Sequence, residues 1–264
     1  MPTSQLEGLR VGWDCIGDGP AVVVFNGIGA DRSSTAQTAA WLAAEGFRAI
    51  TLDNPGAGES DRKGEDCSVG VMADVVAALL DSLGIDQAHL LGHSMGGAIS
   101  QELAVRRPDL VASLQLHCTW GRTDPYLAAL FASWGRLAEA IGPVAIWEHM
   151  LLWAVTPTFY DAHPEVIEEW LGSMAADPSC SVEGFRDHVR ACVTHDAIDR
   201  LGGVTAPTLL TAGEFDRICR PEHTDALRAA MPHASSHIWE GVGHLPFLEA
   251  PAAFGETVLA FLRR

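Results

Sequence analysis

Gly92-His93-Ser94-Met95-Gly96 joins an apolar, strand-like run at His89–Gly92 to a helix-forming segment at Ala98–Arg106. The G-x-S-x-G spacing is typical of a sharp strand-to-helix turn that lifts a serine hydroxyl off the edge of a sheet. The glycines let strand and helix approach without a Cβ clash, and the Met95 N–H comes at the helix N-terminus, where it can stabilise an oxyanion. We therefore predict that Ser94 is a nucleophile and that Met95 supplies one oxyanion donor. The alternative is an ordinary turn that matches the pattern by chance.

A serine nucleophile needs a base within hydrogen-bond reach and an acid that fixes the tautomer of that base. Asp216 follows the strand-like run Pro207–Gly213, and His244 lies in a glycine-flanked loop after the run Ser235–Glu240. The carboxyl ends of parallel strands meet at one sheet edge, so both side chains are expected beside Ser94. The sequence therefore predicts a Ser94–His244–Asp216 triad.

Other residues compete for two of these roles. Glu214 is an alternative acid, although its place closer to the strand also suits an ion-paired residue at the rim, and we favour Asp216. We interpret His93 as a packing or hydrogen-bonded histidine, because a side chain adjacent to Ser94 in sequence normally points away from it. Three further histidines are expected at the surface: His223, His233 and His237.

Strand-like runs alternate with helical segments along most of the chain, which predicts an α/β fold with a mostly parallel sheet covered by helices on both faces. The additional strands are expected at Leu9–Ile16, Ala21–Phe25, Phe47–Asp53 and Val111–His117, and the additional helices at Ser34–Glu45, Val69–Leu83, Pro221–Met231 and Pro251–Leu262. The alternation stops between about Trp120 and Leu201, where only helices are expected, at Tyr126–Ile141, Val144–Val155 and Pro164–Ala175. We therefore predict a core formed by residues 1–119 and 202–264, interrupted by a helical cap at 120–201.

The loop Asn26-Gly27-Ile28-Gly29 follows the buried run Ala21–Phe25 and faces the predicted elbow. A backbone N–H from this loop can be the second oxyanion donor, and we assign it to Ile28; the alternative is a plain glycine-rich turn. A dinucleotide site is not expected, since no glycine cluster spells G-x-G-x-x-G at the start of a helix.

Composition excludes several classes of function. The 264 residues carry a formal charge of −17, which is unfavourable for binding a nucleic-acid backbone. No stretch approaches the roughly 20 apolar residues of a membrane helix, and the first seven residues do not resemble a signal peptide, so we expect a cytoplasmic location. Six scattered cysteines and the absence of an H-E-x-x-H motif predict reduced thiols and no metal site.

These motifs together resemble the α/β-hydrolase family. Asp53–Asp61 is similar to the family's D-x-R-G-x-G-x-S segment, with Asn54 and Pro55 in place of its usual residues, and Gly243–Pro251 matches its histidine segment. Within the family the chain most resembles 3-oxoadipate enol-lactonases, because Asn26–Asp31 is similar to their N-S-L-G-T-D loop. The resemblance implies a small lactone substrate that bears a carboxylate.

The predicted cap is rich in large aromatic side chains, which either form an apolar substrate pocket or pack the cap onto the core. Trp134 and Phe131 are our candidates for contacting substrate. Trp134 and Arg136 resemble the family's W-x-x-R pattern with one residue fewer between them, so Arg136 is a candidate for a substrate carboxylate; the alternative is a solvated helix residue.

The expected chemistry is acyl transfer from a small-molecule ester or lactone to water, with no cofactor. Carbon–carbon bond hydrolases, thioesterase-like tailoring enzymes and cofactor-free haloperoxidases use the same triad. A further alternative is a hydrolase-fold receptor that binds a ligand and turns it over slowly. An apolar cap surface would also suit a homodimer.

Overall fold

The computed structural model describes residues 2–264 and contains an eight-stranded sheet in the order β1-β2-β4-β3-β5-β6-β7-β8. β1 and β2 are antiparallel to their neighbours, and the six strands β3 to β8 run parallel. The predicted α/β class with a mostly parallel sheet is confirmed. The strands are β1 Thr3–Leu6, β2 Leu9–Ile16, β3 Ala21–Phe25, β4 Arg48–Leu52, β5 Ala88–His93, β6 Val111–His117, β7 Thr208–Gly213 and β8 Ser235–Trp239.

Helices cover both faces of the sheet, which is why a central strand such as β3 is buried along its whole length. Val23 and Phe25 of β3 pack on the side of α2 and α3, whereas Val22 and Val24 pack on the side of α1 and α10. The core helices are α1 Ala36–Ala44, α2 Val69–Ser82, α3 Met95–Arg106, α8 Pro221–Ala230, α9 Pro246–Glu249 and α10 Pro251–Leu262, with short 3-10 turns at Arg32–Thr35, Gly64–Asp66, Pro108–Leu110 and Ile198–Gly203.

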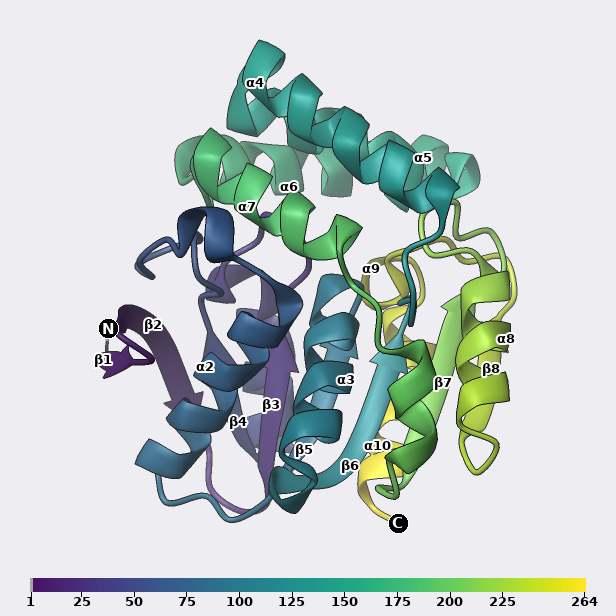
Figure 1. Ribbon diagram of the computed structural model, residues 1–264. Helices are drawn as coiled ribbons and strands as arrows, with labels where there is room; N and C mark the ends of the chain where they lie inside the picture. Colours follow the sequence, from purple (N-terminus) through teal and green to yellow (C-terminus); the bar gives the residue numbers. More distant parts are fainter. Residues whose placement is uncertain (1) are drawn as a thin grey trace.

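The chain between β6 and β7 forms a layer of helices, α4 Pro125–Ala154, α5 Pro157–Ala162, α6 Pro164–Ala176 and α7 Val182–Val193. Figure 1 shows this layer lying across the carboxyl ends of the strands. α4 is broken at Gly142, whose φ of 86° is left-handed, just before Pro143. Its two halves correspond to the two helices expected there, and the division of the chain into core and cap stays a prediction.

Helix α7 contacts the core at a point where neither partner has a side chain. A Cβ built on Gly184 of α7 would lie 2.0 Å from the carbonyl oxygen of Gly56, which itself has a φ of 99°. Beside this contact, Arg62 pairs with the buried carboxylate of Asp187 at 3.0 Å. Helix α7 therefore packs directly on the loop that follows β4.

None of the helices within residues 2–264 combines the length and the apolar character needed to cross a lipid bilayer.

Candidate active site

Ser94 lies between β5 and α3 in a strained backbone conformation, with φ 54° and ψ −122°. This left-handed geometry is unfavourable for a non-glycine residue and persists only where neighbouring contacts enforce it. The Ser94 N–H donates to His117 O at 3.0 Å, and the Thr119 hydroxyl donates to Ser94 O at 2.7 Å. Both peptide groups of Ser94 are thus fixed by the end of β6, and its side chain opens onto a cavity.

The glycines around Ser94 are required by close contacts. A Cβ on Gly92 would meet Ser100 Oγ at 2.5 Å, one on Gly96 would meet Phe25 Cβ at 2.6 Å, and one on Gly97 would meet the Thr119 side chain at 2.6 Å. These distances are shorter than any real Cβ contact, so α3 packs against β3 and β6 only because the side chains are missing. The predicted strand–turn–helix context of the motif is thereby explained.

Asp216 and His244 lie together at the carboxyl edge of the sheet, as the sequence predicts. His244 Nδ1 is 2.8 Å from Asp216 Oδ2, and both side chains are buried. The other carboxylate oxygen, Asp216 Oδ1, accepts the backbone N–H groups of Ile218 and Cys219, each at 2.9 Å. The acid is thereby held in one orientation, and His244 shares the cavity wall with Ser94.

The competing residues take other positions. Glu214 is exposed and accepts the Gly241 N–H at 2.9 Å, so it stabilises the loop before His244 rather than contacting the imidazole. His233 and His237 are exposed as expected. The expectation for His223 is wrong: it is buried, and its Nε2 lies 3.1 Å from Asp124 Oδ2.

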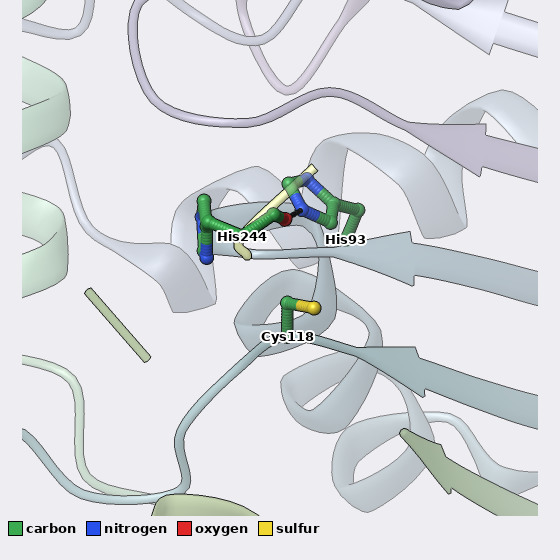
Figure 2. A group of neighbouring side chains, drawn as sticks. All are labelled: His93, Cys118 and His244. Atoms are coloured by element: carbon green, nitrogen blue, oxygen red, sulfur yellow. Dashed lines mark hydrogen bonds between the residues drawn. The ribbon is translucent and has the colours of Figure 1, made fainter. Parts of the chain in front are cut away.

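His93 is hydrogen-bonded to the backbone of the His244 loop. Its Nε2 donates to the backbone oxygen of His244 at 2.7 Å, and the two rings lie 4.7 Å apart (Figure 2). Burial lowers the pKa of His93 well below its usual value, and the nearby His244 adds to this effect. His93 is therefore a neutral hydrogen-bonded histidine, in agreement with its interpretation from sequence.

His93, Cys118 and His244 each offer one potential metal-ligand atom within 4.8 Å of the others (Figure 2). Two ring nitrogens of this group are already engaged, since His93 Nε2 contacts His244 O and His244 Nδ1 contacts Asp216. Burial also raises the pKa of Cys118 well above its usual value, which disfavours the thiolate that a metal needs. We therefore interpret the group as packing around His244 and not as a metal site.

The two backbone amides predicted as oxyanion donors belong to Met95 and Ile28. Neither the Met95 N–H nor the Ile28 N–H has a hydrogen-bond acceptor within residues 2–264. The Ile28 loop lies against the elbow, because a Cβ on Gly27 would be 3.9 Å from Ser94 Cβ. The Ile28 loop is thus adjacent to Ser94, and the assignment of the Met95 and Ile28 amides as oxyanion donors stays a prediction.

His188 of α7 is a residue that sequence reasoning missed. Its Nδ1 accepts the Gly29 N–H at 3.0 Å, and its Nε2 donates to Pro55 O at 3.0 Å. Burial lowers its pKa to about 4, so the imidazole stays neutral and can accept at one nitrogen while donating at the other. The cap helix thereby joins the Ile28 loop to the loop after β4.

Glu249 fixes a second junction between cap and core. Its Oε2 accepts the Thr156 N–H and hydroxyl at 3.1 and 2.7 Å, and its Oε1 accepts the Gly243 N–H at 3.0 Å. The His244 N–H donates to Ala154 O, at the end of α4, at 2.7 Å. The end of α4 and the His244 loop are therefore positioned together.

A cavity of about 930 Å³, part of it open to solvent, extends from Ser94 and His244 toward the cap. Trp134 lines it, as predicted, together with Trp147 and Trp170. Phe131 does not, because its ring packs against Trp120 and Trp134 in the interior of the cap. Arg136 is exposed on the outside of α4 and also lies away from the cavity. The predictions for these two residues fail because helical spacing does not reveal which face of α4 is turned inward.

Comparison with known proteins identifies relatives that match nearly the whole chain. A family model described as "alpha/beta hydrolase fold" matches residues 20–251. The "Putative carbamate hydrolase RutD" of Pseudomonas syringae pv. syringae (strain B728a) is 28% identical over 247 residues, which are 93% of this chain and 94% of that protein.

Solved structures are similar over their full length. A thermophilic esterase from Thermogutta terrifontis has a TM-score of 0.86 at 29% identity, with 99% of this chain and 96% of that one covered. The enol-lactonase from Burkholderia xenovorans LB400 has a TM-score of 0.90 at 24% identity and full coverage of both chains, which shows a shared fold.

Proposed function

Because the chain belongs to the α/β-hydrolase family, we propose that it is a serine-dependent hydrolase that cleaves a carboxylic ester or lactone through an acyl-enzyme intermediate. The observation that carries this proposal is the 2.8 Å contact between His244 and a buried, doubly hydrogen-bonded Asp216, on the same cavity as the strained Ser94. Backbone strain of this kind is typical of a catalytic residue, whereas in a scaffold or a simple binding protein it would only lower stability. The relatives described above, an esterase and a proposed carbamate hydrolase, agree with hydrolysis of an acyl compound.

The proposed reaction begins with proton transfer from the Ser94 hydroxyl to His244 Nε2 while Ser94 Oγ attacks the substrate carbonyl. Asp216 accepts the Nδ1–H of His244 and stabilises the imidazolium that forms. The amides of Met95 and Ile28 donate to the carbonyl oxygen as it becomes negative. The C–O bond to the leaving alcohol then breaks, and the alcohol takes the proton from His244.

Water resolves the acyl-enzyme by the same route. His244 accepts a proton from water, the hydroxide oxygen attacks the acyl carbon, and Ser94 Oγ leaves with the proton returned by His244. The products are a carboxylic acid and an alcohol, or a hydroxy acid when the substrate is a lactone. Every step uses side chains and backbone amides of this chain alone.

We further assign a positioning role to His188. By holding the Gly29 N–H and the Pro55 carbonyl, it fixes the loop on which Ile28 presents its amide. His188 does not line the cavity, so it acts through the loop and not on the substrate.

The test is steady-state hydrolysis of a panel of p-nitrophenyl esters and small lactones by the wild type and Ser94→Ala, with labelling of each protein by a fluorophosphonate. Ser82→Ala is the control, since the Ser82 hydroxyl donates to Leu79 O on the far helix α2. We expect ester hydrolysis and labelling in the wild type and in Ser82→Ala, and loss of both in Ser94→Ala. Activity that survives in Ser94→Ala would contradict the mechanism. Labelling without turnover would favour carbon–carbon cleavage, thioester or haloperoxidase chemistry, or a slow ligand receptor.

A further inference from the structure

The wall of the Ser94 cavity is apolar on both sides of the sheet edge. The cap contributes Trp147, Met150 and Trp170, and the opposite side contributes Leu91 and Phe254. Leu91 and Phe254 belong to the core layer of α1 and α10, so the lining includes side chains from that layer as well as from α4 and α6. An acyl chain and a leaving group both meet hydrocarbon, whichever side each occupies.

No Lys, Arg, Asp or Glu side chain of residues 2–264 lines this cavity. The polar side chains on its wall, apart from Ser94 and the two histidines, are all neutral: Asn26, Ser34, Thr35 and Thr38, and the indoles of Trp134, Trp147 and Trp170. The Trp134 indole N–H has no acceptor among the described residues and is a neutral donor. The cavity therefore offers hydrogen bonds but no counter-ion.

Arg32 and Arg217, which are close in sequence to the cavity-lining residues Ala30 and Ile218, bind other groups. The Arg32 guanidinium pairs with Asp14, Asp53 and Glu59, behind the Ile28 loop. Arg217 donates to the carbonyl oxygens of Leu152 and Val155, at the end of α4. Arg136, the candidate partner for a substrate carboxylate, is exposed outside the cavity. A carboxylate in the cavity would lose its hydration and find no cation in exchange, which is strongly unfavourable.

We infer that the substrate of this enzyme is an uncharged, largely apolar ester or lactone, and that carboxylate-bearing substrates of the 3-oxoadipate enol-lactone type are rejected. This inference rests on the proposed function, since it concerns the acyl group that Ser94 attacks. It separates the chain from the enol-lactonases it resembles in its Asn26–Asp31 loop, because this loop lines the cavity without contributing a cation.

Three p-nitrophenyl esters with the same leaving group test the inference: the hexanoate, the adipate monoester with a free carboxylate, and the methyl ester of that monoester. We expect kcat/KM for the hexanoate and the methyl ester to exceed that for the free carboxylate by at least about 100-fold at pH 7.5, because only the charge differs between the last two. A carboxylate ester hydrolysed within about tenfold of its methyl ester overturns the inference.

A cation placed on the wall provides the second test. Trp170 is half-buried on the cavity, so Trp170→Lys introduces an ammonium group there, and Trp170→Leu controls for loss of the ring. We expect the ratio of carboxylate to methyl-ester kcat/KM to rise at least about tenfold in Trp170→Lys relative to Trp170→Leu. An unchanged ratio in a folded Trp170→Lys protein counts against charge exclusion by the wall. Absence of ester turnover and of fluorophosphonate labelling in the wild type would instead overturn the proposed function itself.

Discussion

Replacing His188 by leucine tests whether the cap helps to build the oxyanion hole. Leucine keeps most of the apolar bulk, but it leaves the buried Gly29 N–H and Pro55 O without their partners at 3.0 Å. Each unsatisfied buried group costs about 1–3 kcal/mol, and relaxation of the two loops toward water should bring the total to about 2–3 kcal/mol of unfolding free energy. The Ile28 amide is displaced and not removed, so kcat should fall by about 10–100-fold, less than the 10²–10³ typical of deleting an oxyanion donor.

The assay combines urea unfolding with ester kinetics on the same preparations of His188→Leu, His188→Gln and His195→Leu. Glutamine retains one acceptor and one donor and should recover much of the lost kcat. His195 is an equally buried cap-side histidine whose Nε2 lies 3.4 Å from Gln101 Oε1, away from the Ile28 loop. His195→Leu should therefore lose stability while its kcat stays within about twofold of the wild type.

The two readouts distinguish positioning from structural support. If His188→Leu is destabilised but keeps the kcat of the wild type, the Ile28 loop is held by other contacts and the positioning role is refuted. If His195→Leu loses kcat as strongly as His188→Leu, the effect is a general consequence of loosening the cap.

Three other perturbations follow from the structure. Asp216→Asn should reduce kcat by about 10⁴-fold, because the amide favours the wrong His244 tautomer. The kcat of Glu214→Gln should stay within about twofold of the wild type, and comparable losses in both variants would contradict the assignment of Asp216 as the acid. Gly184→Ala should lower the unfolding free energy by about 1–3 kcal/mol, since its Cβ would meet Gly56 O at 2.0 Å. The control Gly172→Ala, in open space on α6, should be neutral or stabilising by up to about 1 kcal/mol. Equal urea midpoints for the two variants would contradict this packing. Unfolding free energy should fall as pH drops from about 6.5 toward 4, because the unfolded chain protonates histidines that burial keeps neutral in the fold, each contributing about 1.4 kcal/mol per pH unit. Burial lowers the pKa to about 3 or 4 for His117, His188 and His195. A urea midpoint that does not change between these pH values would show that these histidines are not neutral in the fold.

The positions of Ser94, Asp216 and His244 could be read from sequence because local chain geometry determines them. The glycines around Ser94 record contacts with adjacent strands, and any loop that follows a parallel strand reaches the same sheet edge. Strand limits were also close, since β4 covers Arg48–Leu52 where Phe47–Asp53 was expected. Short buried runs between turn residues leave little choice of conformation.

Long-range pairings could not be read in this way. His188 lies 159 residues from Gly29 and 133 from Pro55, so nothing in its own segment identifies it as a partner of the Ile28 loop. His223 was expected at the surface because its partner, Asp124, is 99 residues away. Phe131 and Arg136 show the same limit within one helix, since burial of a helix face depends on what packs against it.

The structure also separates two parts of the cap that differ in how freely they can change. The end of α4 is tied to the His244 loop through Ala154 O, and α7 is tied to the Ile28 loop through His188, so both anchors act on residues proposed to carry the reaction. Trp147 and Trp170 line the cavity, with their rings 5.4 Å apart in an edge-to-face contact. Trp147 also packs close to the Ile28 loop, since a Cβ built on Gly29 would lie 3.3 Å from its ring. Substitution of Trp170 is therefore the change expected to alter which acyl group fits while the oxyanion donors and the histidine keep their positions. The acyl specificity of this site can therefore change at the aromatic wall without any change in the proposed triad.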